Sequence, residues 1–234
     1  PMYARNAVAL ALLVAAMLPL GALAQVPEGA PIGASVGPID RPDGEVARQP
    51  GPCFTGCGGV VAPAQRADLE LETVRLTNLE RAAQGLPPLK AVEELTHAAR
   101  YHATDMSQEA YFEHDSRDAG RKVCDWDERV GGYYPGGQSM GENIAAGYGT
   151  PQATIAAWMA SSGHRANILH PAFWEIGVGY HQGSTGYGDY WVQDFGRRPG
   201  SYPLVIDGEA QQTDQLNVSL YIYGEWSEMR LRNE

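Results

Sequence analysis

The sequence predicts an α+β fold. Apolar residues recur at helical spacing over much of the chain from about residue 65 to residue 170, and a spacing of two takes over after Pro171. Helices first and antiparallel strands afterwards are typical of α+β proteins rather than of alternating α/β proteins. Of the 234 residues, 44% are hydrophobic, which is enough for the core of one domain of ordinary size.

The first 24 residues have the pattern of a secretory signal peptide. Arg5 is their only charged residue, and an uninterrupted apolar run extends from Ala7 to Leu18. Small residues at Ala22 to Ala24 suit a signal peptidase, so we expect a mature chain that begins at Gln25. No second long apolar stretch follows. We therefore expect a secreted protein, extracellular or periplasmic, with no transmembrane anchor after cleavage.

Residues 25–62 are dense in Pro and Gly and show no apolar period, which predicts a disordered linker. The cysteines are few: Cys53, Cys57 and Cys124. One disulfide is compatible with an oxidising compartment, but the sequence leaves its pairing open. A structural zinc site would need a fourth ligand of this kind.

Two helices are predicted at the start of the ordered region. The first places on one face the residues Leu69, Leu76, Leu79 and Ala83, and it ends before Gly85 and Pro87. The second runs from about Glu93 to Gln108, with acidic residues at its positive end. His102 lies on the apolar face of this helix and is expected to be a packed core residue.

The second half of the chain contains one further long helix and then strands. After an irregular region with a short helix near Trp126, Thr150 and Pro151 predict a helix start by side-chain capping and a first-turn proline. After Pro171, residues 176–180 alternate apolar residues with glycines, and Tyr190 to Phe195 form the returning strand of a hairpin. We expect the tryptophans of this half, Trp158, Trp174 and Trp191, to belong to the core.

Residues 200–234 form a β-rich extension. Val218, Leu220 and Ile222 alternate with polar or aromatic residues and indicate two or three strands. Because so few strands are rarely stable alone in water, we expect an incomplete further module.

The chain is acidic, with a formal net charge of −11 at pH 7. An acidic surface repels phosphate groups, so nucleic acids and anionic membranes are poor candidate partners.

A set of short phrases in a fixed order resembles a known family. The phrases are "NLERAAQGLPPLK", "AARYHATDM", "YFEHDS", "GENIAAG", "AAWMASSGHRANIL", "EIGVGY" and "YWVQDFG". Together they resemble the CAP superfamily of cysteine-rich secretory, antigen 5 and pathogenesis-related proteins, and most closely its bacterial SCP-like branch. The resemblance covers roughly residues 65–196, within a predicted domain of residues 63–199.

The resemblance implies an α-β-α sandwich with a small antiparallel sheet and a central cleft. In many members two His and two Glu line the cleft and hold a divalent metal. Three of these carry over by position, to His114, Glu142 and His164, while Ser161 stands where the second Glu is usual. Glu175 lies in a nearby phrase but not at the matching position.

Two imidazoles and one carboxylate suit Zn²⁺ or another divalent cation, so His114, His164 and Glu142 are the candidate metal ligands. Loss of the fourth ligand would weaken binding without preventing it. The alternative is a purely structural polar network that connects the same residues. Ser161, and also Ser116, are candidate lining residues of the cleft.

Fold does not fix function, and two classes remain open. We favour a non-enzymatic binding module whose cleft holds a metal or an extracellular ligand, such as a small apolar molecule, a peptide or a cell-envelope component. The alternative is a metal-dependent, peptidase-like hydrolase, with Glu142 or a histidine as general base. The missing second Glu favours the binding module.

Overall fold

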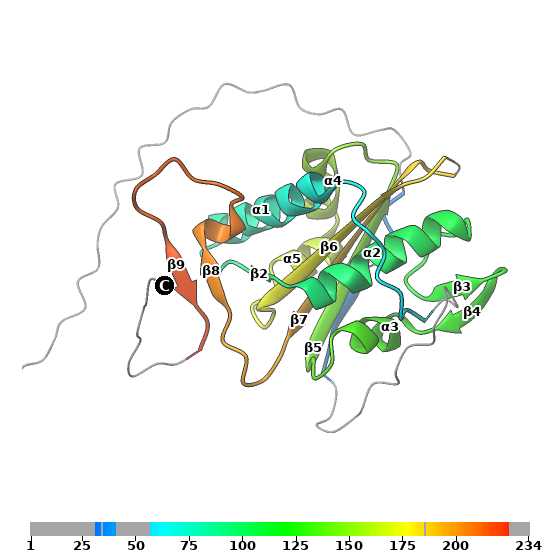
Figure 1. Ribbon diagram of the computed structural model, residues 1–234, viewed down its shortest axis with the longest axis horizontal. Coiled ribbons are helices and arrows are strands. Elements are labelled where there is room, and N and C mark those ends of the chain that lie inside the picture. Colours follow the sequence, from blue (N-terminus) through cyan, green and yellow to red (C-terminus); the bar gives the residue numbers. More distant parts are fainter. Residues whose placement is uncertain (1–30, 34, 41–56, 185, 225–234) are drawn as a thin grey trace, which may run out of the picture.

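The computed structural model describes residues 31–33, 35–40, 57–184 and 186–224 (Figure 1). The helices are α1 (Ala67–Ala83), α2 (Glu93–Gln108), α3 (Trp126–Tyr133), α4 (Pro151–Ala160) and α5 (Ser162–Ile168), with a short 3₁₀ turn at Asp207–Glu209. The strands are β1 (Val36–Asp40), β2 (Lys90–Ala91), β3 (Ser116–Asp118), β4 (Arg121–Cys124), β5 (Ser139–Ala146), β6 (Glu175–Gln182), β7 (Asp189–Arg197), β8 (Leu204–Ile206) and β9 (Leu220–Ile222). The predicted start of α4 is confirmed, because the Thr150 side chain caps the helix and Pro151 occupies its first turn.

The central sheet has the strand order β1-β5-β7-β6-β2. Strands β5, β7 and β6 pair antiparallel along their full lengths, with Glu142 opposite Asp194 and Gly177 opposite the same residue on the other side. The two-residue strand β2 is the exception and pairs parallel to β6. The sheet therefore consists of a long antiparallel centre with short strands at both edges.

Helices cover both faces of this sheet (Figure 1). One face of β6 packs Ile176 and Val178 into a cluster with Val74 of α1, Trp158 of α4 and Ile168 of α5. The opposite face is covered by α2, which packs against β6 and β7. The predicted α+β class and α-β-α sandwich are confirmed.

The glycines of the phrase "EIGVGY" set the distance between α2 and the sheet. A Cβ atom built on Gly177 would lie closer than 3.0 Å to backbone atoms of Leu95, and one on Gly179 equally close to backbone atoms of Ala99. A helix backbone cannot yield as a flexible side chain can. The sheet therefore contacts α2 at these two positions through glycine, which lets the helix pack unusually close.

The predicted apolar face of α1 is confirmed for Leu69 and Leu76, which pack against the core, and is wrong for Leu79 and Ala83, which are exposed. Leu79 is 52% exposed, and the residues that α1 buries are mostly polar, among them Glu70 and Arg81. Glu70 accepts hydrogen bonds from Arg100 of α2, and Arg81 donates to the carbonyl oxygens of Pro87 and Ile168. Burial is possible because these charges are paired or hydrogen-bonded, a condition that apolar spacing does not register.

The prediction of a disordered linker is wrong for part of residues 25–62. Residues 36–40 form β1, which pairs antiparallel with β5, and Ala62 is buried. A strand held through backbone hydrogen bonds at a sheet edge needs no apolar period of its own, so Pro and Gly do not rule it out. Within residues 25–62, the structure describes residues 31–33, 35–40 and 57–62. The other residues of that range lie outside the described residues, and so does the predicted signal peptide, residues 1–24.

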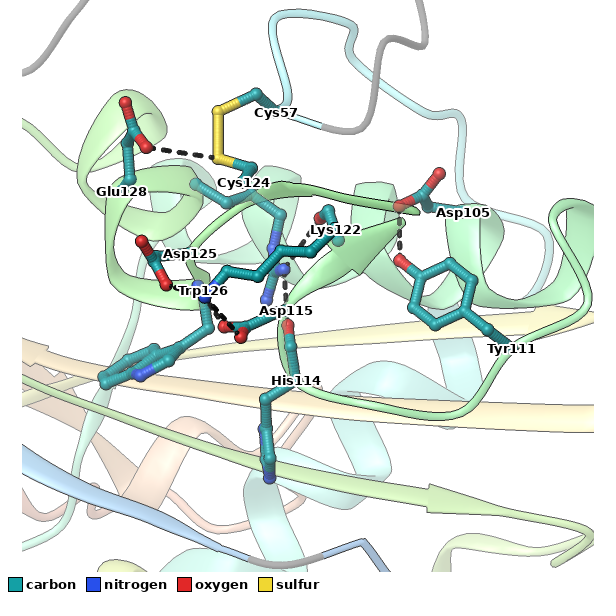
Figure 2. Close-up of a disulfide and its surroundings, with 12 residues drawn as sticks. Cys57, Asp105, Tyr111, His114, Asp115, Lys122, Cys124, Asp125, Trp126 and Glu128 are labelled. Carbon is teal, nitrogen blue, oxygen red and sulfur yellow. Dashed lines mark hydrogen bonds and ion pairs between the residues drawn. A yellow bond between two sulfur atoms is a disulfide. The ribbon is translucent and has the colours of Figure 1, made fainter. Parts of the chain in front are cut away.

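A disulfide joins Cys57 to Cys124, at the end of β4 (Figure 2). It connects the segment before α1 to the small β3–β4 hairpin, across 67 residues of sequence. Tyr133 of α3 adds a second attachment, since its hydroxyl donates to the Val60 carbonyl at 2.6 Å. Cys53 lies outside the described residues.

The described part of the C-terminal extension packs against α1 and β2 rather than standing apart. Strands β8 and β9 pair antiparallel, which confirms a strand pair in the tail. Asn78 of α1 donates to the Gly208 carbonyl, Lys90 pairs with Glu209, and Tyr223 stacks on Trp174 at 5.0 Å between ring centroids. Trp174 is therefore half-buried by the tail, whereas Trp158 and Trp191 are fully buried as predicted.

We expect Gly177→Ala to lower the free energy of unfolding by about 1–3 kcal/mol, the usual effect of overpacking a core. The added methyl group meets the α2 backbone, which must shift. Urea denaturation measures the change. Gly149→Ala is the matched control, because a Cβ there has nothing within 4 Å. Equal stability of the two variants would contradict the close approach.

We expect reduction of the disulfide, or Cys57→Ser, to lower the free energy of unfolding by on the order of 4 kcal/mol, because the closed loop restricts the unfolded chain. Non-reducing peptide mapping should recover Cys57 linked to Cys124, and Cys53→Ser should leave stability unchanged. Recovery of a Cys53–Cys57 link would refute the pairing.

Candidate functional site

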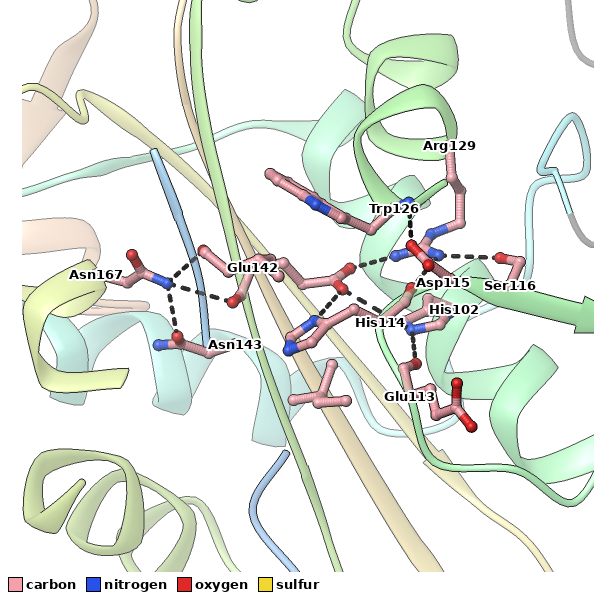
Figure 3. A network of polar contacts seen from close by, with 12 residues as sticks. His102, Glu113, His114, Asp115, Ser116, Trp126, Arg129, Glu142, Asn143 and Asn167 are labelled. Atoms are coloured by element: carbon pink, nitrogen blue, oxygen red, sulfur yellow. Dashed lines mark hydrogen bonds and ion pairs between the residues drawn. The ribbon is translucent and has the colours of Figure 1, made fainter. Parts of the chain in front are cut away.

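Two histidines and a glutamate from different parts of the chain lie in the same region of the fold. His114 lies in the loop between α2 and β3, Glu142 lies on β5, and His164 lies on α5. Figure 3 shows the Glu142 side chain pointing toward His114, with Arg129 of α3 on its other side. The three residues predicted from the sequence thus come from one region of the fold.

Glu142 is held on both sides in a fully buried position. Its Oε1 atom accepts a hydrogen bond from Nδ1 of His114 at 2.7 Å, and its Oε2 atom accepts one from Arg129 at 2.5 Å. Nε2 of His102 lies 3.9 Å from Oε1. Both carboxylate oxygens are therefore engaged within the protein.

These contacts fix the state of His114. A carboxylate can only accept, so Nδ1 of His114 carries the hydrogen, and in the neutral ring Nε2 presents its lone pair. That Nε2 atom is buried and has no hydrogen-bond partner in the described part of the chain. At His164, Nδ1 lies 2.7 Å from the Ser161 hydroxyl, which can donate or accept and therefore does not fix the tautomer. Its Nε2 is buried without a hydrogen bond of good geometry among the described residues, although the backbone of Gly33 is close enough to act on the ring.

Charge and burial separate the protonation states of these groups. Burial opposes ionisation of Glu142, but Arg129 and the neighbouring histidines outweigh it and hold the pKa of this carboxyl well below its usual value. Burial, and then the nearby His114, lower the pKa of His164 to about 4, while a backbone contact from Gly33 acts in the opposite direction. His164 is therefore neutral at pH 7, the state in which an imidazole binds a metal or accepts a hydrogen bond.

Arg129 and Asp194 belong to the site, and sequence reasoning missed both. Arg129 is completely buried and donates to Glu142, to the His114 carbonyl and to the Ser116 hydroxyl. Asp194 on β7 lies directly opposite Glu142 on β5. Burial, and then the negative charge of Glu142, raise the pKa of the Asp194 carboxyl well above its usual value. A signal was available for Asp194, because an acidic residue within the apolar strand "YWVQDF" requires an explanation.

Two asparagines connect α5 to the sheet edge. Asn167 of α5 donates to the side chain of Asn143 at 3.0 Å and to the carbonyl oxygens of Glu142 and Val36 (Figure 3 shows the first two contacts). Asn143 in turn donates to the His164 carbonyl. The helix that carries His164 is thus held in register with the strand that carries Glu142.

The three predicted metal ligands do not form an assembled centre. Within the described residues, three ligand-type atoms within 4.8 Å of one another occur only at Cys57, Cys124 and Glu128, where the two sulfurs are joined in the disulfide. The two Nε2 atoms fit metal ligation, because they are buried and make no hydrogen bond of good geometry among the described residues. The Glu142 carboxylate fits less well, because both oxygens are already engaged.

The remaining candidates have structural partners. Ser116 is fully buried and bonds to Arg129, and Ser161 bonds to His164 between α4 and α5. Glu175 contacts Tyr134 and Arg198 rather than the histidines, in agreement with its position outside the family pattern. His102 is fully buried as predicted, but it also takes part in the polar network, since its Nε2 lies 2.9 Å from the Glu113 carbonyl.

Residues 74–195, a little more than half of the chain, match the sequence model of the CAP family, the cysteine-rich secretory protein family. The chain belongs to the CAP family. The resemblance stated from the sequence phrases is confirmed, and the matched region includes His114, Glu142 and His164.

Two curated relatives are proteins of Bacillus subtilis (strain 168). The uncharacterized protein YkwD is 42% identical over 134 residues, which are 57% of this chain and 49% of YkwD. The uncharacterized membrane protein YlbC is 30% identical over 129 residues, 55% of this chain and 34% of YlbC. The chain therefore spans about half of one relative and a third of the other.

A solved structure shows the same fold. An outer surface protein of Borrelia burgdorferi superposes with a TM-score of 0.51 at 17% identity, over 59% of this chain and 99% of that protein. In the part of the chain that the structure describes, every helix is too short or too polar to span a membrane.

We expect acid to destabilise the folded chain partly through His164. The unfolded chain binds a proton at this residue near pH 6.5, whereas the folded chain does so only near pH 4, so stability falls as the pH drops through that window. His164→Asn cannot titrate and should show a smaller loss of unfolding free energy between pH 7 and pH 5 in urea denaturation. Asp105, whose pKa burial raises to about 6, also titrates in this pH range, but it is present in both proteins and affects both equally. An identical loss in both would contradict a neutral, buried His164.

Proposed function

We propose that this CAP-family protein is a secreted binding module whose ligand, a divalent metal or a small extracellular molecule, is held by His114 and His164. The observation that carries the proposal is the pair of buried Nε2 atoms, neither of which makes a hydrogen bond of good geometry among the described residues; for His164, the Gly33 backbone is the nearby group that a ligand would replace. A buried polar atom without a partner is costly, and a bound ligand removes that cost.

The surroundings of His114 support a ligand-binding role. A metal-binding histidine usually donates the N–H of its non-ligating ring nitrogen to a carboxylate, a backbone carbonyl or water. This hydrogen bond fixes the tautomer and makes the metal-binding nitrogen more basic. Glu142 supplies that carboxylate, and Arg129 keeps it ionised. Glu142 is thus better described as the residue that orients His114 than as a ligand. The two imidazole nitrogens would hold Zn²⁺, which would act there as a Lewis acid toward a donor atom of the bound molecule.

Two protein ligands make a weak zinc site, because tetrahedral sites normally take three or four. Ser161 offers a hydroxyl where a second carboxylate would complete the set, and that hydroxyl already contacts Nδ1 of His164. A ligand that brings its own donor atom is therefore favoured over the bare ion.

The hydrolase alternative has less support. It needs a general base that is free to take a proton, and both oxygens of Glu142 accept hydrogen bonds while its pKa is held low. His164 has a free nitrogen, but its pKa of about 4 makes it a weak base at neutral pH.

Secretion is supported by two observations. The first 24 residues have the composition of a signal peptide, and the structural neighbour from Borrelia burgdorferi is an outer surface protein. The cell-envelope side is also where a disulfide such as Cys57–Cys124 persists.

Titration calorimetry with Zn²⁺ at neutral pH tests the proposal. We expect weak binding by the wild type, loss of binding in His164→Ala, and tighter binding in Ser161→Glu, which restores a carboxylate. His97→Ala is the control, since it removes an imidazole on α2 that is not part of the site. No heat of binding with the wild type, or binding unchanged in His164→Ala, would remove the metal role and leave His164 in a structural network.

A further inference from the structure

The described residues of the segment 31–36 lie along the outer edge of β5, close to His164. The amide of Ala146 donates to the Pro31 carbonyl at 3.1 Å, and Ile32 forms an isolated antiparallel bridge with Ala145. At the other end, Val36 lies opposite Glu142, and its carbonyl accepts a hydrogen bond from Asn167 at 2.8 Å. An extended segment is thus added to the sheet next to the candidate site.

The contact is close at two glycines, where a larger residue would force a neighbouring side chain to move. A Cβ atom on Gly33 would lie closer than 3.0 Å to the Ile144 side chain, and a Cβ atom on Gly163 of α5 would lie equally close to the Ser35 hydroxyl. The backbone of Gly33 also forms a hydrogen-bonding contact with the His164 ring, which opposes the lowering of the His164 pKa by burial. The segment therefore lies between β5 and α5, with the Gly33 backbone close to His164; we refer to the space that it fills there as the groove.

The segment is held through its backbone and through one apolar side chain, Ile32, which packs against the cluster between the sheet and α1, α4 and α5. The hydrogen bonds just described, from the Ala146 amide and the Asn167 side chain, both end on carbonyl oxygens of the segment. Backbone hydrogen bonds at a sheet edge give sequence-tolerant affinity, while tight positions select for small residues. An extended peptide with glycine at the position of Gly33 meets both conditions.

Residues 31–40 are a weak occupant of such a groove. The segment "PIGASVGPID" contains two prolines, which cannot donate to a strand ladder, and two glycines, which weaken strands. Its register with β5 is interrupted between Val36 and Ile39. Such a segment binds the groove weakly, but it is part of the same chain. Its effective concentration at the groove is therefore in the millimolar range, on the order expected for a short tether, and this keeps it bound.

We propose that the groove between β5 and α5 is a binding site for an extended peptide with small residues, and that residues 31–40 are its built-in, displaceable occupant. The proposal deepens the proposed function and rests on it, since it names a peptide as the ligand class of the His114–His164 site. Displacement of the segment would open the site to a partner polypeptide that adds a strand to β5.

A labelled synthetic peptide, PIGASVGPID, tests the proposal by fluorescence anisotropy with the full chain. In the wild type the tethered segment competes with the peptide. Gly33→Val introduces a side chain that clashes with Ile144, so the tethered segment should leave the groove and the peptide should bind about tenfold more tightly or better. Ser35→Val replaces the hydroxyl that faces Gly163 with a larger branched side chain, and it should act in the same direction.

The controls keep the test specific. Gly149→Val places the same side chain in open space and should bind the peptide as weakly as the wild type. A peptide that itself carries valine at the Gly33 position should bind none of the proteins. Equal peptide binding by wild type, Gly33→Val and Ser35→Val, or binding of the valine peptide as tight as that of the original, would overturn the proposal.

Zinc titration of the same proteins separates this proposal from the function on which it rests. Peptide binding without zinc binding would leave the groove intact and remove only the metal role of the imidazoles. Zinc binding together with equal, weak peptide binding in all variants would overturn the groove and keep the imidazole site.

Discussion

The buried ion pair between Glu142 and Arg129 is the constraint on which the site depends. Both side chains are fully buried, and removing one partner of such a pair typically costs about 3–5 kcal/mol, because the other charge is left without compensation. The pair joins α3 to β5 and fixes the tautomer of His114. Burial, and then the carboxylate of the pair, raise the pKa of the neighbouring Asp194 carboxyl. One interaction therefore sets both the architecture and the electrostatics of the region.

The central sheet positions the site because each of its two faces, and its β5 edge, contacts a different part of the chain. Glycines of β6 let α2 pack against the sheet at backbone distance, which helps to position the following loop and His114. The opposite face packs α1, α4 and α5 into one apolar cluster, and α5 carries His164. Strand β5, next to the edge segment, carries Glu142.

The segment along β5 gives the protein a property that neither the cleft nor the sheet has alone. An unpaired strand edge close to His164 would attract other chains, and natural proteins cover or blunt such edges. Here the cover is a short stretch of the same chain, rich in Pro and Gly and fitted through Gly33 and Ser35. Protection of the edge and control of access to His164 are then the same physical event.

The sequence by itself determined the fold class, the helix boundaries near Glu93 and Thr150, and the family, because local spacing, caps and ordered phrases are written in consecutive residues. It also identified the two histidines. Only the tertiary structure decided which cysteines pair, that α1 buries charges, and that residues 36–40 form a strand on β5. It alone showed that the two carboxylate oxygens of Glu142 accept hydrogen bonds from His114 and Arg129. These outcomes depend on contacts between residues far apart in the chain, and such contacts leave no periodic signal in the sequence.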